Sequence, residues 1–348
     1  MKAKIFQIIA LFFLFSCTGK PETKLEDWTR ISELLKYRED SADLILHSGA
    51  SAYRLPLAEL PFKKVVLLNA SLVGYFTELG LEDRIIGISS PEYIYSPRVQ
   101  ALINNNSILN VGNEQKYNVE KIIALKPDAV FTNRIATFSS TYDLLEKNGI
   151  PVIFLDEYLE KEPLSRSRYL LLIGKLMGME RKAAGKFMDI KKTYDSLALL
   201  VSGEKTRPVV LANEMYGSQW YLPGGQSMTA HFIRDAGGSY INAGSKGAGA
   251  EVRSFEEVFS KSQNACIWVN AGNHQSRGDL LQANPNYSKM EVFRSGKIYT
   301  VTQKERGRSN DYFESGVVRA DLVLKDYIMI FHPDLLPGYN LTYLKELK

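Results

Sequence analysis

The sequence is poor in cysteine and histidine, and this scarcity excludes several classes of protein. Its 348 residues contain two cysteines, Cys17 and Cys266, which is too few for a disulfide framework. The four histidines are His47, His231, His274 and His332. They are scattered, and no two have the spacing of metal ligands on a helix. The sequence therefore predicts no binding site for a bare metal ion, and a stable fold has to depend on its hydrophobic core.

The motifs of common enzymes are absent as well. The chain has no Gly-x-Ser-x-Gly, no His-Glu-x-x-His and no Cys-x-x-Cys sequence, and its glycine-rich stretch 244–249 lacks the Lys-Ser/Thr ending of a phosphate-binding loop. The formal net charge is only +4, and Lys2 and Lys4 supply two of these charges at the N-terminus. Such a balance argues against a nucleic-acid-binding surface. We expect no enzymatic activity and no nucleic-acid partner.

The N-terminus has the features of a bacterial lipoprotein signal. Lys2 and Lys4 precede an apolar run, Ile5–Phe15, which is followed by Ser16 and Cys17. The run is too short to span a bilayer comfortably, and no later stretch approaches the necessary length. Cleavage before Cys17 would leave a cysteine that carries acyl chains. This predicts a protein anchored by lipid to a bacterial membrane and facing the periplasm or the outside; an ordinary secretory signal is the alternative.

Beyond the leader, short apolar runs alternate with amphipathic helical patterns, which predicts an α/β fold with parallel sheets covered by helices. The expected strands are 65–68, 85–88, 129–131, 152–155, 209–212, 265–270 and 298–301. Between the two groups, apolar residues recur every three or four positions over 180–201 without a proline, which predicts a helix of roughly 33 Å. The run around Cys266 predicts a buried thiol on a strand.

These patterns divide the chain into consecutive segments. The expected boundaries are a signal peptide over 1–16, a lipidated cysteine with tether and irregular lead-in over 17–63, an N-terminal lobe over 64–158, linker helices over 159–203, a C-terminal lobe over 204–336 and a tail over 337–348. A weak internal repeat relates residues 118–130 to residues 254–266, which predicts two similar lobes joined by a single long helix.

Several segments resemble the periplasmic substrate-binding proteins of ABC importers for vitamin B12 and ferric siderophores. The most specific is Val119–Val130, and Leu172–Gly178, Ile233–Gly238 and Ser254–Val258 add to it in the same order and spacing. The run from Tyr312 to Pro333 is similar to a lipoprotein branch of that family. The resemblance implies a class III binding-protein fold, a monomer, an ABC permease as partner, and a metal chelate as transported ligand rather than an intrinsic cofactor.

The resemblance also implies two residues for docking onto the permease. Glu120 and Glu256 match acidic residues that, in this family, contact arginines of the transporter, one from each lobe. One exposed carboxylate on each lobe would let the permease sense the spacing of the lobes. Glu257 competes with Glu256 for this role. The alternative for both positions is a solvated glutamate that complements a helix dipole.

A ligand should lie between the lobes, at loops that follow the carboxyl ends of strands. The segment Tyr216–Gly225 follows a predicted strand and contains Tyr216, Trp220 and Tyr221 in what we expect to be a loop. Aromatic rings clustered in a loop favour a flat apolar wall for a ligand. We therefore expect these three side chains to contact the ligand.

The opposite wall is expected from the N-terminal lobe and from two arginines. Tyr93 and Tyr95 follow the strand 85–88 and share one side of an extended segment by alternation. Arg134 and Arg306 follow two other strands, where a guanidinium could bind a carboxylate or an anionic chelate. Salt bridges are the alternative for the arginines. His274 is expected to be solvated.

The sequence thus predicts a substrate-binding lipoprotein of an ABC importer that captures a ferric siderophore, haem or cobalamin. It does not distinguish these ligands. A surface lipoprotein that holds a nutrient without a permease, and a secreted hydrolase, are the alternatives.

Overall fold

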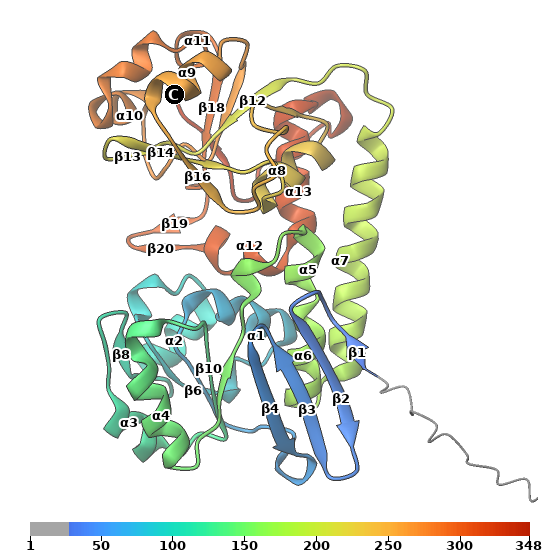
Figure 1. Ribbon diagram of the computed structural model, residues 1–348, viewed down its shortest axis with the longest axis vertical. Coiled ribbons are helices and arrows are strands. Elements are labelled where there is room, and N and C mark those ends of the chain that lie inside the picture. The colour runs from blue at the N-terminus through green and yellow to red at the C-terminus, as the bar shows by residue number, and fades with distance from the viewer. Residues whose placement is uncertain (1–27) are drawn as a thin grey trace, which may run out of the picture.

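The computed structural model describes residues 28–348. The leader and Cys17 lie outside the described residues, so the signal peptide and the lipid anchor stay predictions. The described chain forms two α/β lobes placed one above the other along the longest axis, with helix α7 (Glu180–Val201) running along one side of both (Figure 1).

The N-terminal lobe contains a parallel five-stranded sheet in the order β11-β10-β5-β6-β7. The strands are β5 (Val65–Leu67), β6 (Ile85–Ile88), β7 (Leu109–Asn110), β10 (Ala129–Thr132) and β11 (Val152–Phe154). Its helices are α1 (Val73–Leu79), α2 (Pro97–Asn104), α3 (Val119–Leu125) and α4 (Ser139–Lys147). The strands are apolar on both faces because helices cover both sides, as the sequence pattern predicts.

A second sheet precedes this lobe, and the prediction of an irregular lead-in is wrong for it. Residues 29–56 form a four-stranded antiparallel sheet, β1-β2-β3-β4. Its strands are β1 (Thr29–Arg30), β2 (Leu35–Asp40), β3 (Asp43–Ser48) and β4 (Ser51–Pro56). Leu35, Leu44, Leu46 and Leu55 enter the core of the N-terminal lobe, while the residues next to them on the strands, such as Lys36, Ile45 and Arg54, are partly or fully exposed. This alternation, with charged residues on the outer face, hides the strands from a search for apolar runs.

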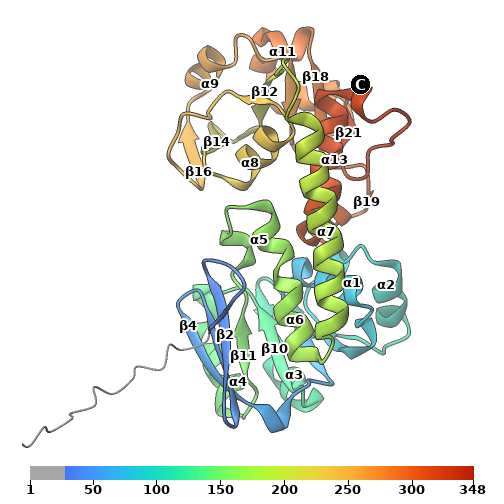
Figure 2. The ribbon, with the colours of Figure 1, turned by 90° about the vertical axis from the view of Figure 1, so that its right-hand side faces the viewer.

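Three helices connect the lobes. Short helices α5 (Pro163–Ser167) and α6 (Tyr169–Met177) lead into α7, as Figure 2 shows from the side of α7. The bounds of α7 confirm the predicted helix. Ala183 and Ile190 from its first half pack in the N-terminal core, and Tyr194, Leu197 and Val201 from its second half pack in the C-terminal core. The helix is therefore part of both cores.

The C-terminal lobe has a five-stranded sheet in the order β15-β12-β17-β18-β21. The strands are β12 (Val209–Ala212), β15 (Ser239–Tyr240), β17 (Ile267–Val269), β18 (Lys297–Thr300) and β21 (Lys345–Glu346). Its helices are α8 (Met228–Asp235), α9 (Phe255–Lys261), α10 (Arg277–Ala283), α11 (Glu291–Arg294), α12 (Ser315–Val318) and α13 (Ala320–Phe331).

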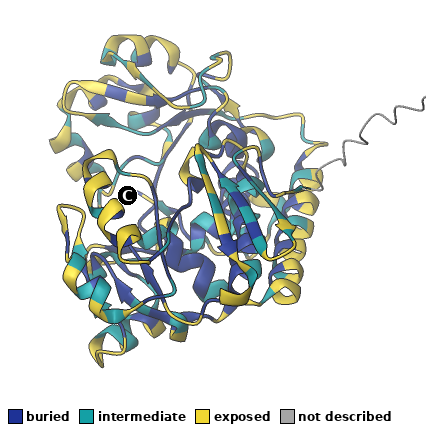
Figure 3. Cartoon of the chain, turned by 60° about the horizontal axis from the view of Figure 1, so that its bottom comes forward, coloured by how far each residue is buried: buried dark blue, intermediate teal, exposed yellow. Residues whose placement is uncertain are grey.

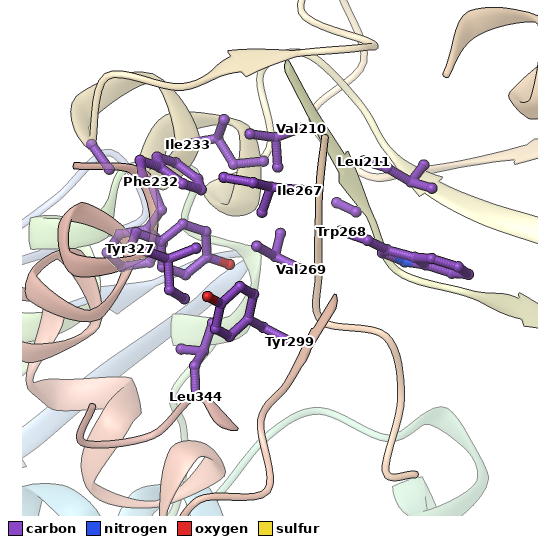
Figure 4. Close-up of a cluster of buried hydrophobic side chains, with 14 of the residues drawn as sticks. Val210, Leu211, Phe232, Ile233, Ile267, Trp268, Val269, Tyr299, Tyr327 and Leu344 are labelled. Atoms are coloured by element: carbon purple, nitrogen blue, oxygen red, sulfur yellow. The ribbon is translucent and has the colours of Figure 1, made fainter. Parts of the chain in front are cut away.

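The core of this lobe joins residues that are distant in the chain (Figure 4). Val210 and Val269 from the sheet lie on the side of Tyr327 from α13 and of Leu344 beside β21, whereas Trp268 points to the opposite side of the sheet. The segment expected to be a tail thus supplies an antiparallel edge strand, in which Tyr299 pairs with Glu346.

Three small antiparallel elements complete the fold. They are the ribbon β13 (Met215–Tyr216), β14 (Gln219–Pro223) and β16 (Ala250–Arg253), the hairpin β19 (Glu305–Arg306) and β20 (Ser309–Asn310), and the pair β8 (Gly112–Asn113) and β9 (Lys116–Tyr117). Figure 3 shows the buried strands enclosed by helices with exposed outer faces. Among the helices of residues 28–348, none combines the length and the apolar character needed to cross a bilayer.

The prediction for Cys266 is wrong. Its thiol is exposed just before β17, at the start of the strand, and it donates weakly to the carbonyl oxygen of Val209 at 3.7 Å. The buried residues of this strand are its neighbours Ile267, Trp268 and Val269. The apolar run correctly indicates a strand, but Cys266, the residue directly before that strand, does not share its burial.

Candidate functional site

A cleft of about 620 Å³ lies where the loops after the N-terminal strands face a segment of the C-terminal lobe. Residues that follow β5, β6, β10 and β11 form one wall, as expected for the carboxyl edge of a parallel sheet. The other wall comes from residues 308–317, at the hairpin β19–β20 and α12. The lining residues include Asn69, Ser71, Tyr93, Asn133, Arg134, Glu157, Tyr158, Arg166, Arg308, Asn310 and Phe313.

The floor of the cleft is a fully hydrogen-bonded polar network. The carboxylate of Glu157, only 1% exposed, accepts a hydrogen bond from Ser71 Oγ at 2.8 Å and another from Asn133 Nδ2 at 2.8 Å. Asn69 donates to Asn133 in turn. Burial raises the pKa of Glu157, while the two hydrogen bonds oppose that rise. The network satisfies the hydrogen-bonding capacity of the buried carboxylate.

Three arginines supply positive charge above this floor. Arg166 is held by backbone carbonyl groups, because its Nε donates to Glu157 O at 3.0 Å and its Nη2 to Tyr158 O at 2.9 Å. The guanidinium of Arg134 lies 3.9 Å from the centre of the Phe154 ring and donates to Ser51 Oγ. Of the described carboxylates, none lies within ion-pair distance of these two guanidinium groups.

Arg308 reaches the cleft from the hairpin. Its guanidinium lies 4.6 Å from the centre of the Tyr93 ring, donates to the hydroxyl of that tyrosine, and lies 4.0 Å from a carboxylate oxygen of Glu92. The distance to Glu92 is at the limit of an ion pair, and both side chains are exposed, so that contact neutralises little of the charge. Glu114 and Glu157 also line the cleft, and Arg134 opposes the rise that burial causes in the pKa of the neighbouring Asp156, so the three guanidinium groups are partly balanced by carboxylates.

Aromatic rings give the cleft apolar surface. Tyr93 lies on one side and Phe313 on the other, and Tyr158 lies between them in the connection that leads from β11 to α5. Tyr158 is 46% exposed and Phe313 is 54% exposed, although both are large rings. Exposed aromatic faces beside guanidinium groups can bind a flat or aromatic ligand that carries negative charge.

A second cavity of about 380 Å³ adjoins this cleft. Tyr158 and Arg166 line both spaces. The far wall of the second cavity comes from the C-terminal lobe, at Pro223, at the first turn of α8 and at residues 248–250. The two lobes thus face each other across the second cavity.

Of the predicted ligand-binding residues, Tyr93 and Arg134 line the main cleft. Tyr95 and Arg306 lie beside it and contact each other: the Arg306 guanidinium is 4.5 Å from the centre of the Tyr95 ring and donates to the Tyr95 carbonyl oxygen. Neither side chain lines the main cleft. Instead of the salt bridge considered as the alternative, Arg306 contacts an aromatic ring and a backbone carbonyl group.

The three aromatic residues predicted for the C-terminal wall lie elsewhere. Trp220 is fully buried, its Nε1 donates to Ala212 O at 3.1 Å, and its ring packs 5.6 Å from that of Trp268. The expectation that Trp220 contacts a ligand is therefore wrong. Tyr216 is 82% exposed and Tyr221 is 39% exposed, and neither lines the main cleft or the second cavity. The segment is a strand pair rather than a loop, so its alternate residues point into the core.

The two residues predicted to dock onto a permease occupy equivalent positions. Glu120 and Glu256 are each the second residue of a short helix, α3 and α9, and both are exposed. The helices lie in different lobes, on the side away from α7 (Figures 1 and 2). Glu257 closes a capping box with Ser254, and its pKa is lowered by that contact. Because Glu257 is hydrogen-bonded in the capping box, Glu256 is the carboxylate of α9 that corresponds to Glu120 of α3.

Apart from Tyr93 and Arg134, the residues that line the cleft were not predicted from the sequence; they include Tyr158, Arg166, Arg308 and Phe313. Arg308 belongs to the polar run Arg306–Asn310, which follows a strand. A polar run at that place is a signal that could have indicated a ligand contact. Arg166 lies in the linker, where no local pattern indicates a ligand.

Among residues 28–348, no group of three or more histidine, cysteine, aspartate and glutamate side chains is arranged to hold a metal ion. His274, expected to be solvated, is partly buried, and its Nε2 lies 2.7 Å from Glu214 Oε2. This pair belongs to the C-terminal lobe and lines neither cavity.

Comparisons with known proteins agree with this architecture. The model of the family described as periplasmic binding protein matches residues 65–305. An uncharacterized lipoprotein of Methanocaldococcus jannaschii is 23% identical over 288 residues, which are 80% of this chain and 67% of that protein.

Solved structures share the fold. A periplasmic haem-binding protein from Pseudomonas aeruginosa has a TM-score of 0.62 at 16% identity, covering 82% of this chain and 98% of that one. The Helicobacter pylori CeuE structure with Ni(II) bound has a TM-score of 0.61 at 19% identity, covering 81% of this chain and 87% of that one. The matched family, the lobed α/β architecture and the cleft agree, and the chain belongs to the periplasmic binding protein family.

Proposed function

We propose that this protein captures an anionic metal chelate, a ferric siderophore or haem, and delivers it to an ABC permease. The observation that carries the proposal is the cluster of Arg134, Arg166 and Arg308 around one aromatic-walled cleft. Guanidinium groups bind carboxylates and other planar anions through paired hydrogen bonds. The family consists of solute-binding proteins, and the proposed role is therefore capture and transfer without covalent chemistry.

The charge of the cleft favours some chelates over others. Haem carries two propionates, and ferric tris-catecholates carry three negative charges around a set of aromatic rings. Cyanocobalamin has no net charge and offers a single phosphodiester anion, so it would leave guanidinium groups of the cleft without anionic partners when it displaced their water. We therefore rank cobalamin below the two anionic ligands.

Thermal unfolding of the chain from Thr18 onward tests the proposal. Haemin, a ferric tris-catecholate and cyanocobalamin are added separately. A ligand present at about 100 times its dissociation constant should stabilise the fold by about 2.7 kcal/mol and raise Tm by a few degrees. We expect this shift with one of the anionic chelates. No shift with either of them would contradict the proposed ligand class, and a shift with cyanocobalamin alone would reverse our ranking.

Delivery to a permease is the second part of the proposal. Its support is the equivalent placement of Glu120 and Glu256, one on each lobe. Charge reversal of both, Glu120→Lys with Glu256→Lys, should abolish ligand uptake by cells and leave ligand affinity unchanged, because neither residue lines the cleft. Asp189→Lys on the exposed surface of α7 is the matched control.

The outcome separates two functions. If uptake is unchanged in the double variant but ligand still binds, the protein holds its ligand without docking through these carboxylates, as a surface lipoprotein without a permease would. The proposed lipid anchor at Cys17 would keep either kind of protein at a membrane surface.

A further inference from the structure

One segment of the C-terminal lobe lies on the N-terminal lobe. After β18 the chain leaves the C-terminal sheet, forms the hairpin β19–β20 and α12, and returns through α13. Figure 1 shows this segment between the lobes. We name residues Glu305–Val318 the clasp.

Glu314 makes the most buried polar contact of the clasp. The residue is 2% exposed, and its carboxylate accepts hydrogen bonds from the backbone N–H groups of Tyr95 at 2.7 Å and Ser96 at 3.0 Å. Both donors belong to the N-terminal lobe. Burial raises the pKa of Glu314 to about 7, with Asp311 adding to the rise and the two backbone donors and Arg306 opposing it. A buried carboxylate without these partners would be costly, so the contact fastens the clasp to this loop.

Two arginines of the clasp hold the same loop. Arg306 lies over the Tyr95 ring and donates to the Tyr95 carbonyl oxygen, and Arg308 lies over the Tyr93 ring and donates to its hydroxyl. The loop Tyr93–Ser96 is thus contacted by Glu314 from one side and by the hairpin from the other.

Helix α12 adds a backbone contact. A Cβ atom placed on Gly74 of α1 would lie 2.3 Å from the Glu314 carbonyl oxygen, so the two helices approach closely only because this residue is glycine. Ser167 Oγ in α5 donates to Val318 O at 2.6 Å, which ties the end of the clasp to the linker.

Different parts of the chain line the two cavities. The main cleft is lined by the N-terminal lobe, by the linker and by the clasp, and by none of the described residues in 204–304. The second cavity is instead lined by linker residues on one side and by residues 223–250 on the other. If the clasp stays on the N-terminal lobe when the C-terminal sheet moves away, the second cavity widens and the main cleft keeps both walls. The contacts of the clasp with the C-terminal lobe, Asn310 Nδ2 to Val301 O at 3.0 Å and Ser315 Oγ with Tyr343 Oη at 2.9 Å, would then have to break.

We propose that Glu314 is a positioning residue for the ligand: it fastens the clasp to the N-terminal lobe, so that Arg308, Asn310 and Phe313 form one rigid body with the opposite wall of the main cleft. This inference rests on the proposed function and deepens it. It differs from a mechanism in which rocking of the two lobes about α7 opens the main cleft.

The test compares two buried carboxylates. Glu314→Gln removes the negative charge and one of the two carboxylate oxygens, so that an NH2 group faces the backbone N–H of Tyr95 or Ser96 where the wild type has an acceptor. Asp326→Asn is the matched control, because Asp326 is 0% exposed and accepts backbone hydrogen bonds from Thr342, Tyr343 and Leu344 within the C-terminal lobe. Arg306→Met is a milder clasp variant on an exposed side chain that lines neither cavity.

Amide hydrogen exchange at Tyr95 and Ser96 and the affinity for haemin and a ferric tris-catecholate are the readouts. In the ligand-free wild-type chain we expect slow exchange at both amides. Glu314→Gln should accelerate it about tenfold or more and weaken binding by a similar factor, and Arg306→Met should do both to a smaller extent. Asp326→Asn should lower stability without changing either readout.

Three results would overturn the inference. Fast exchange at Tyr95 and Ser96 in the free wild-type chain, slowed by ligand, would mean that the clasp moves with the C-terminal lobe. Unchanged affinity in a folded Glu314→Gln chain would remove its positioning role, and so would equal losses of affinity in the Asp326→Asn control. If neither probe binds the wild-type chain, the proposed ligand class fails, and the exchange measurements still decide whether the clasp is fastened to the N-terminal lobe.

Discussion

Replacement of Arg134 and Arg308 by methionine should weaken the binding of haemin or of a ferric tris-catecholate by roughly 100-fold or more. Each guanidinium can make charge-assisted hydrogen bonds to an anionic ligand, and losing one such interaction costs about 1.5–3 kcal/mol. Methionine retains apolar volume and removes the charge. Titration of the chain with each chelate at low and moderate salt gives the affinities, and the wild-type affinity should fall more steeply with salt than that of the variant.

The control for this pair is Arg294→Met on α11. Arg294 is 60% exposed and pairs with Glu291, three residues earlier on the same helix, so this variant changes the net charge without touching the cleft. We expect its affinity to match the wild type. An equal loss in the control would mean that net charge alone attracts the ligand. Unchanged affinity in the double variant would contradict the assignment of the anion-binding groups.

The fold is predictable from the sequence because its signals are local. The bounds of α7 follow from apolar spacing along 22 residues, and β6 and β12 are short runs that have to be buried on both faces. The internal repeat is also local: α3 leads into β10 and α9 leads into β17, and each of these strands pairs with the first strand of its sheet. The strand order of the two sheets nevertheless differs.

The site is less predictable because it is assembled from distant segments. Tyr93 and Arg134 follow strands of the N-terminal sheet, and the rule that sites lie at strand carboxyl ends finds them. Arg308 lies 215 positions from Tyr93 in the chain, and the contacts of the clasp bring it to the same cleft. The spacing of residues within a short stretch of sequence cannot indicate a contact between such distant segments.

The ribbon at Tyr216–Pro223 shows how composition misleads. Three aromatic residues within six positions suggest a binding surface, but alternation along β14 directs Trp220 and Leu222 inward and Gln219 and Tyr221 outward. The turn at Gly217, with φ of +61°, lets the two short strands form a hairpin. On this strand the inward-pointing apolar side chains therefore belong to the core and do not contact a ligand.

Trp220→Ala should therefore destabilise the fold by about 3–5 kcal/mol, as expected when a large buried aromatic is truncated. The ring packs against Trp268 and Tyr287, with ring centroids at 5.6 Å and 5.8 Å. Its removal leaves a cavity between them and leaves the buried Ala212 carbonyl without its indole donor. Denaturant unfolding measures the effect, and the midpoint should fall while the slope stays near that of the wild type.

Tyr216→Ala is the matched control, because Tyr216 lies on the paired strand of the same ribbon and is 82% exposed. Its free energy of unfolding should stay within about 0.5 kcal/mol of the wild type. At a temperature where Trp220→Ala is folded, its affinity for the chelate should be retained, because Trp220 lines neither cavity. A Trp220→Ala chain of normal stability that failed to bind would restore the role that the sequence predicted for this residue, so stability and affinity measured on one variant decide between core and cleft.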